Sequence, residues 1–328
     1  MLPGRDELEA AARLVHAVMP PTPQYRWPLL ERRAGCTLWV KHENHTPAGA
    51  FKVRGGIVHF DRLSRATPKV TGVVTATRGN HGQSVAMAAT RHGIPSVVVV
   101  PLGNSREKNA AMRAQGAELV EEGNDFQAAA EVADRIARER GWYRLPSFHR
   151  DLVAGVGTYA MELFGAVPDL EQVYVPIGLG TGICGVLAAR EAMRSTAEVI
   201  GVVSAHAPAY ALSLARGEPV SHPATTVLAD GVACRTPVPE ALAMMTGRVS
   251  RVVQVTDAQV AAAMRAFFTD THNVAEGAGA AGLAAVLAEP AAVAGKRVAV
   301  ILCGGNVDAE LFADVLRGRD QGDGTRDA

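Results

Sequence analysis

The sequence predicts an α/β protein built on parallel sheets. Six short runs rich in β-branched residues alternate with longer Ala-rich amphipathic stretches along most of the 328 residues. The runs are apolar along their whole length, which is typical of parallel strands covered by helices on both faces. Three of the runs lead directly into glycine-rich loops, at the edge where open α/β sheets bind ligands.

The elements follow one another in a regular order. The expected strands are 72–77, 96–101, 117–121, 172–177, 198–204 and 297–302. The expected helices are 81–92, 105–115, 125–139, 183–193, 257–270 and 278–288. Residues 71–149 form a compact run of strand–helix repeats, so we expect a small domain there, inserted into a larger one made of 1–70 and 150–318. The polar, Gly-rich residues 319–328 are expected to be disordered.

Composition argues against several classes of function. Lys+Arg and Asp+Glu are equal at 33 each, so no net charge draws the chain to nucleic acid or acidic membranes. No segment reaches the roughly 20 apolar residues of a membrane span, and the amino terminus lacks the regions of a signal peptide. The four cysteines are far apart without a CxxC, which indicates neither a zinc site nor disulfides and favours a reducing cytoplasm. The HxxH of His42 and His45 has no nearby partner pair and is interpreted as ordinary.

One lysine stands in an unusual setting. Lys52 lies in TPAGAFKVRGG (46–56), among small and apolar residues, with Arg54 as the only other charge. Lysine is rarely buried unpaired, because an ammonium removed from water loses its hydration or its proton. Lys52 is therefore either a surface residue at a helix start or an amine tuned for covalent chemistry. This stretch alone leaves both interpretations open.

A glycine-rich loop follows the expected strand 172–177. It carries four glycines within eight residues before a helix, a pattern that lets amides at the helix start bind an anion. Gly180, Gly182 and Gly185 match the dinucleotide pattern GxGxxG, but the next strand ends in Ser-Ala-His at 204–206, without the acidic residue that holds a ribose. No GK[ST] follows either. The loop therefore favours a smaller phosphate ester, with a tight strand-to-helix turn as the alternative.

Two further loops end strands in the same way. TATRGNHGQS (75–84) offers several amides at a helix start, suited to a carboxylate, and Asn80 and His81 add polar side chains. VAVILCGGNVD (298–308) delivers Cys303 to the end of a strand, although free cysteine is more often simply buried.

Together these stretches resemble the pyridoxal-phosphate enzymes of fold type II, in particular the group of threonine dehydratases, serine dehydratases and serine racemases. Seven motifs match in order: VKHENHTPAGAFKVRGG, TRGNHGQS, GVGTYAMEL, VPIGLGTGICG, LADG, AEGAGAAGLAA and CGGNVD. Each is weak alone, but their common order and spacing are specific. The resemblance implies two parallel-sheet domains of tryptophan synthase β-subunit-like architecture, pyridoxal 5'-phosphate as cofactor, an amino-acid substrate and a homodimer.

The resemblance also implies a role for each motif. Lys52 is expected to be the catalytic Schiff-base lysine, Phe51 to pack on the pyridine ring, and Asn80 to bind the phenolic oxygen of the ring. Cys303 falls where relatives place a residue beside the ring nitrogen. The residues expected to bind the cofactor phosphate are Gly178, Leu179, Gly180, Thr181 and Gly182. The residues expected to bind the substrate are Thr77, Arg78, Gly79, Asn80 and His81.

The activity implied is that of an ammonia-lyase, which converts threonine or serine to a 2-oxo acid and ammonia. Lys52 would remove the α-proton, and the β-hydroxyl would leave with help from the cofactor phosphate. A neutral Cys303 beside the ring nitrogen does not stabilise a protonated pyridine, which favours β-elimination over transamination. No regulatory-sized extension follows the last strand, so isoleucine control through this chain is not expected.

Departures from the family pattern define the alternatives. Serine racemases carry a serine that acts as second base where this chain has Arg78, and arginine is a poor base, so racemisation is disfavoured. Arg78 either reads a second carboxylate, as in 3-hydroxyaspartate, or points outward. Glu276 keeps a family position, with either a catalytic or a structural role. Around Asp230 the sequence lacks the acidic cluster with which some relatives bind a divalent cation, so a metal site is not indicated.

Two other activities are weighed against the leading one. β-Replacement enzymes of this fold usually carry KDR where this chain has KVR. A catalytically silent binding protein would be expected to lose the lysine, the asparagine or the glycine loop, and all three are present.

Overall fold

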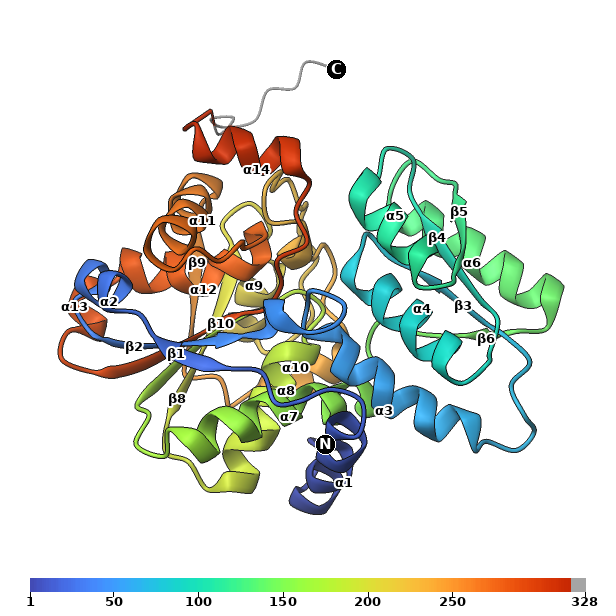
Figure 1. The fold of residues 1–328 in the computed structure, drawn as a ribbon, viewed down its shortest axis with the longest axis horizontal. Helices are drawn as coiled ribbons and strands as arrows, with labels where there is room; N and C mark the ends of the chain where they lie inside the picture. The colour runs from blue at the N-terminus through green and yellow to red at the C-terminus, as the bar shows by residue number, and fades with distance from the viewer. Residues whose placement is uncertain (320–328) are drawn as a thin grey trace.

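The computed structural model describes residues 1–319 and contains two sheets, each with helices packed around it (Figure 1). Residues 320–328, on which most of the tail expectation falls, lie outside the described residues. The six-stranded sheet has the order β1-β2-β10-β7-β8-β9, with strands Gln24–Arg26, Thr37–His42, Arg297–Leu302, Gln172–Pro176, Glu198–Ser204 and Arg251–Val255. The four-stranded sheet has the order β5-β4-β3-β6, with strands Glu118–Glu121, Ser96–Val100, Val73–Ala76 and Tyr143–Arg144.

Strand pairing is parallel throughout both sheets, except at one edge. Only the short edge strand β1 runs antiparallel to its neighbour β2. The central strands β3, β4, β8 and β10 are buried over all or nearly all of their residues, as expected for strands covered on both faces. The predicted α/β class with parallel sheets is confirmed.

The helices agree closely with the sequence periodicity. Those predicted are α4 (Asn80–Arg91), α5 (Arg106–Ala114), α6 (Phe126–Arg140), α8 (Thr181–Met193), α11 (Asp257–Thr271) and α12 (Gly277–Ala288). Those not singled out are α1 (Arg5–His16), α2 (Pro28–Ala34), α3 (Lys52–Ser64), α7 (Arg150–Ala166), α9 (Ala209–Arg216), α10 (Pro239–Met245), α13 (Pro290–Val293) and α14 (Ala309–Leu316). Helix α8 begins two residues before its predicted start, which changes the chemistry of the glycine loop.

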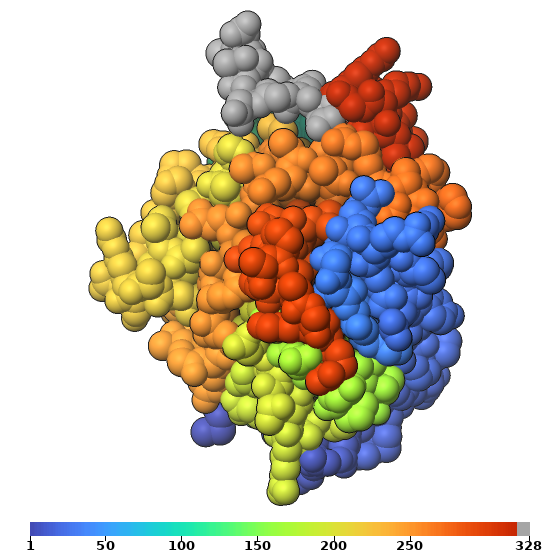
Figure 2. All heavy atoms as spheres, turned by 90° about the vertical axis from the view of Figure 1, so that its left-hand side faces the viewer, coloured from blue at the N-terminus to red at the C-terminus, as the bar shows by residue number. Residues whose placement is uncertain are grey.

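The two sheets belong to separate parts of the chain. All strands of the four-stranded sheet fall between residues 73 and 144, whereas the six-stranded sheet combines residues from both sides of that segment. Figure 2 shows the consequence on one face, where the blue N-terminal segment packs beside the red-orange C-terminal one, in keeping with the pairing of β2 with β10. Helices α3 and α7 lead into and out of the smaller part and pack on each other. The domain boundaries 71–149 remain a prediction.

The helices were also compared with the length and apolar character of a membrane span. Within residues 1–319, no helix combines the length and the apolar character needed to cross a bilayer.

Candidate active site

A cavity of about 1040 Å³ lies where the carboxyl ends of β3, β7 and β10 face one another. Its volume is at the upper end of the range for small-molecule sites. The cavity is lined by nearly all of the predicted site residues: Phe51, Lys52, Thr77, Arg78, Asn80, His81, Gly178, Leu179, Gly180, Thr181, Gly182, Glu276 and Cys303. Gly79 does not line it and is buried within its loop. Residues as far apart in the sequence as Phe51 and Cys303 are therefore brought to one site.

Lys52 occupies the first turn of α3, inside this cavity. Its position is fixed from behind, because the backbone N–H of Phe51 donates to the carbonyl of Cys303 at 3.0 Å. The ammonium Nζ lies 2.7 Å from Thr181 Oγ1 and 4.9 Å from the centre of the Phe51 ring. Burial lowers the pKa of Lys52 to about 8, against a smaller raising effect of Cys303. A substantial fraction of the amine is therefore neutral near physiological pH, as nucleophilic and general-base chemistry requires.

The glycine loop 178–182 forms the neighbouring wall, in contact with Lys52 through Thr181, and presents the start of α8. Gly180 adopts φ +101°, a conformation that favours glycine, and immediately precedes the helix. Gly178 approaches the neighbouring chain so closely that an added Cβ would lie 2.2 Å from the carbonyl oxygen of Gly231. Because the helix begins at Thr181 and not at 183, the amides of Thr181 and Gly182 belong to its first turn. These amides have no partner within the helix, and a helix N-terminus of this kind suits an anion.

The asparagine loop comes from the smaller sheet and is tied to the larger one. The backbone N–H of Gly79 donates to Thr77 Oγ1 at 3.0 Å. Asn80 Nδ2 donates to Glu276 Oε1 at 2.6 Å, and Asn306 Nδ2 donates to Asn80 Oδ1 at 2.8 Å. These two bonds cross between the parts of the chain that carry the two sheets, so the loop is held over the cavity.

Glu276 is paired with Lys108, a residue that the sequence analysis did not identify. Lys108 Nζ lies 2.8 Å from Asp230 Oδ2 and 3.4 Å from Glu276 Oε2, and all but about a tenth of the Lys108 side chain is buried. Burial raises the pKa of the Glu276 carboxyl, and the ammonium of Lys108 opposes this effect. Nothing in the sequence around Lys108 marks it, because a lysine in a polar helix resembles a solvated face.

Arg78 and His81 differ in exposure. Arg78 is exposed at the cavity and has no hydrogen bond or ion pair with any residue in 1–319. His81 is buried, its Nε2 lacks a partner among the same residues, and burial together with Lys52 lowers its pKa to about 3. His81 is thus a neutral imidazole, whereas Arg78 is a cation free to meet a ligand.

Cys303 completes the cavity at the end of β10. Its thiol is buried, and burial raises its pKa far above the ordinary value, with Glu276 adding to the effect. The group is therefore a neutral thiol at any pH of interest. A ring nitrogen beside it would meet no negative charge from the thiol itself.

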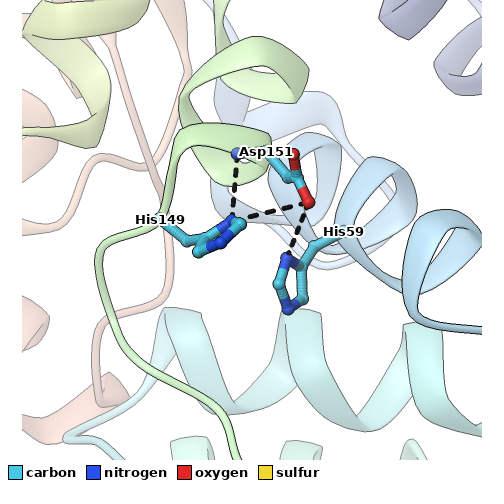
Figure 3. A group of neighbouring side chains, drawn as sticks. All are labelled: His59, His149 and Asp151. Carbon is cyan, nitrogen blue, oxygen red and sulfur yellow. Dashed lines mark hydrogen bonds and ion pairs between the residues drawn. The ribbon is translucent and has the colours of Figure 1, made fainter. Parts of the chain in front are cut away.

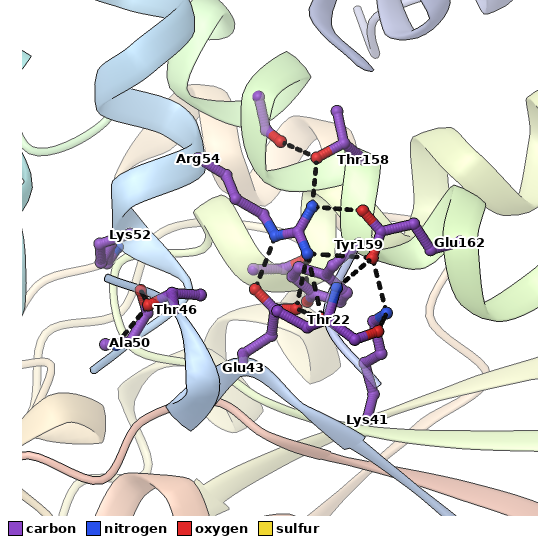
Figure 4. Close-up of polar contacts among 12 residues, drawn as sticks. Thr22, Lys41, Glu43, Thr46, Ala50, Lys52, Arg54, Thr158, Tyr159 and Glu162 are labelled. Carbon is purple, nitrogen blue, oxygen red and sulfur yellow. Dashed lines mark hydrogen bonds and ion pairs between the residues drawn. The ribbon is translucent and has the colours of Figure 1, made fainter. Parts of the chain in front are cut away.

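Behind Lys52 lies a buried ionic cluster, drawn in Figure 4. The guanidinium of Arg54 donates to Glu43 at 2.7 Å and to Glu162 at 2.6 Å, and Lys41 Nζ lies 2.6 Å from Glu162. Arg54, Glu43 and Lys41 have no exposed side-chain surface. The cluster joins the motifs 40–56 and 155–163. Some residues of these two motifs therefore have a structural role and do not line the cavity.

The fold and the site together suit an enzyme in which a buried amine of lowered pKa lies beside a glycine-rich helix N-terminus. Comparison of the sequence with protein-family models agrees: the model described as "Pyridoxal-phosphate dependent enzyme" matches residues 17–304. The chain belongs to this family and depends on pyridoxal phosphate.

Relatives of known identity include an L-threonine ammonia-lyase of Thermotoga maritima. It is 35% identical over 312 residues, covering 95% of this chain and 77% of that protein. An L-threo-3-hydroxyaspartate ammonia-lyase of a Pseudomonas species is 30% identical, covering 95% and 98%. Among solved structures, the processed form of threonine deaminase isoform 2 from Solanum lycopersicum matches with a TM-score of 0.88, 26% identity, and coverage of 97% and 89%.

Proposed function

We propose that the protein is an ammonia-lyase that converts a β-hydroxy amino acid, threonine and/or serine, to a 2-oxo acid and ammonia. The proposal rests mainly on one observation. Lys52, whose pKa is lowered, lies directly beside the glycine loop 178–182 within one cavity. The 35% identity to a threonine ammonia-lyase over 95% of the chain supports the same reaction.

The residues present fit pyridoxal phosphate. The amides at the start of α8 suit a phosphate monoester, since the loop supplies no lysine and no metal motif. The loop also leaves no room for a side chain at Gly178. When bound, the cofactor supplies the electron-withdrawing ring that makes the α-proton of an amino acid acidic.

The chain's own residues would then divide the work. Lys52 would hold the cofactor and would take the α-proton of the substrate at Nζ, since burial favours its neutral form. Thr181 Oγ1 accepts from Nζ and orients it. Phe51 borders the ring, and Cys303 keeps the surroundings of its nitrogen uncharged. Thr77, Gly79, Asn80 and His81 would bind the substrate carboxylate at the start of α4.

A panel of amino acids tests this proposal directly. We expect release of 2-oxo acid and ammonia from threonine or serine. We also expect a near-visible absorbance band that disappears when borohydride fixes the cofactor covalently at Lys52. Racemisation of serine should be absent or minor, because Arg78 offers no second base. A protein that binds the cofactor but turns over no amino acid would instead be the silent binding protein.

3-Hydroxyaspartate is a second candidate substrate. The exposed, unpaired guanidinium of Arg78 at the cavity favours it, as does the Pseudomonas relative. We expect Arg78→Ala to lower kcat/KM for hydroxyaspartate about 10- to 100-fold, roughly 1.4–2.7 kcal/mol, and to spare threonine. A bidentate arginine–carboxylate pair is lost only for the substrate with two carboxylates.

Arg235→Ala is the matched control, because Arg235 is also an exposed arginine lining the cavity. It should leave both substrates unchanged. Equal losses for threonine and hydroxyaspartate in Arg78→Ala would contradict a role in reading the second carboxylate.

The pKa of Lys52 predicts how the cofactor attaches. In cofactor-free protein, the rate of covalent attachment should rise with pH, be half-maximal near pH 8 and level off by about pH 9.5, because only the neutral amine attacks an aldehyde. For an ordinary lysine the rate would be half-maximal only near pH 10.4. Absorbance after mixing with pyridoxal phosphate over pH 6.5–10 measures this, and a rate still rising above pH 9.5 would rule out the lowered pKa.

A homodimer in the cytoplasm completes the proposal. Family resemblance supports the dimer, and light scattering should give about twice the chain mass of 34.4 kDa. The four cysteines are all free thiols, which is compatible with a reducing compartment.

A further inference from the structure

A second cluster of titratable side chains lies outside the cavity, where α3 meets the start of α7 (Figure 3). His59 comes from α3, two turns beyond Lys52. His149 is the N-cap of α7, and Asp151 lies in its first turn. We propose that His59, His149 and Asp151 form a binding site for a divalent transition-metal ion such as Zn²⁺, independent of the proposed lyase reaction.

The geometry is close to that of three ligands sharing one ion. The ligand atoms of the three residues all lie within 4.8 Å of one another. Asp151 Oδ2 is 3.3 Å from His59 Nδ1 and 3.5 Å from His149 Nδ1. Nitrogen and oxygen ligands of a tetrahedral zinc ion, each at 2.0–2.2 Å from the metal, are about 3.4 Å apart. Two of the spacings therefore need only small adjustments.

His59 supplies an independent reason for a ligand. The residue is only 3% exposed, and within residues 1–319 Nε2 has no partner, while Nδ1 makes no hydrogen bond and has only the ion-pair contact with Asp151. Leaving buried polar atoms unsatisfied costs about 1–3 kcal/mol each, so native structures usually provide a partner. A metal ion bound at Nδ1 would satisfy one nitrogen at the point where Asp151 and His149 converge.

Three features of this cluster lower its affinity for a metal ion. Arg62 forms an ion pair with Asp151 through the other carboxylate oxygen, Oδ1. The backbone N–H of Asp151 donates to His149 Nδ1 at 3.1 Å, a bond that coordination through this nitrogen would replace. The N-terminus of α7 also carries a partial positive charge. The Arg62 side chain is 41% exposed, however, so it is able to withdraw into solvent at little cost.

These contacts predict which variants change metal binding. His149→Asn removes the imidazole and keeps a good helix N-cap, so the protein should fold and bind zinc at least about 10-fold more weakly. Arg62→Ala removes the competing cation and should tighten binding. His92→Asn is the matched control, because the half-buried side chain of His92, directly after α4, makes no hydrogen bond or ion pair within residues 1–319.

The experiment is calorimetric titration of the tag-free holoenzyme with Zn²⁺, repeated with Co²⁺, whose visible bands report tetrahedral coordination. We expect one equivalent bound with micromolar affinity, weakened in His149→Asn, tightened in Arg62→Ala and unchanged in His92→Asn. No binding by the wild-type protein, or equal binding by His149→Asn and the wild type, would overturn the proposal. A wild-type site seen only in octahedral Co²⁺ spectra and unaffected by Arg62→Ala would overturn it as well.

Discussion

Lys52→Ala is expected to abolish ammonia release from threonine and serine, with a loss of more than about 10³-fold in kcat. The variant loses both the amine that would hold the cofactor and the base that would take the α-proton. The fold should survive, because Lys52 Nζ makes a single hydrogen bond, to Thr181, and alanine is a good residue for the first turn of α3. Assay of 2-oxo acid release and circular dichroism measure the two effects.

Lys69→Ala controls for the loss of a lysine, because Lys69 is exposed and has no ion pair with the residues described. It should leave turnover unchanged. Wild-type-like turnover in Lys52→Ala, with every substrate that the native enzyme accepts, would rule out the proposed mechanism.

Arg54→Leu is expected to lower the free energy of unfolding by about 3–5 kcal/mol. Glu43 has no exposed side-chain surface and would lose the one ionic partner it has within residues 1–319, because Arg54 Nε and Nη2 hold its two oxygens at 2.7 and 3.0 Å. Glu162 would keep Lys41 but lose the guanidinium that lowers its pKa to about 2. An uncompensated buried carboxylate is the main cost.

Urea denaturation measures this loss, and Arg135→Leu provides the matched control. Arg135 also donates two hydrogen bonds to one carboxylate, that of Glu122, but the two side chains are 47% and 52% exposed. Solvent screens such a pair, so its loss should cost less than about 1 kcal/mol. If the two variants lost similar, small amounts of stability, the buried ionic cluster would not be what stabilises α3, the helix that begins with Lys52.

Secondary structure was predictable wherever the pattern is local. Strands 198–204 and 297–302 were placed to the residue, because a continuous β-branched run ends where polar residues begin. Helix α8 was placed two residues late, since Gly182 reads as loop in the sequence, whereas in the structure Gly180 alone makes the turn. The short strands β1 and β6 carry too few residues for a periodic signal.

The sequence by itself determined the fold class, the three glycine loops at strand ends and Lys52 as the candidate for covalent chemistry. These features are local: a strand period, a glycine at a tight turn, a lysine among apolar neighbours. Only the tertiary structure decided that Lys108 neutralises Glu276 and Asp230, that Arg54 binds Glu43 and Glu162, and that His59 meets His149 and Asp151. The partners in most of these pairs are 90 or more positions apart, and a charged side chain reveals its partner only once folding has buried it, because in the unfolded chain water screens every charge alike.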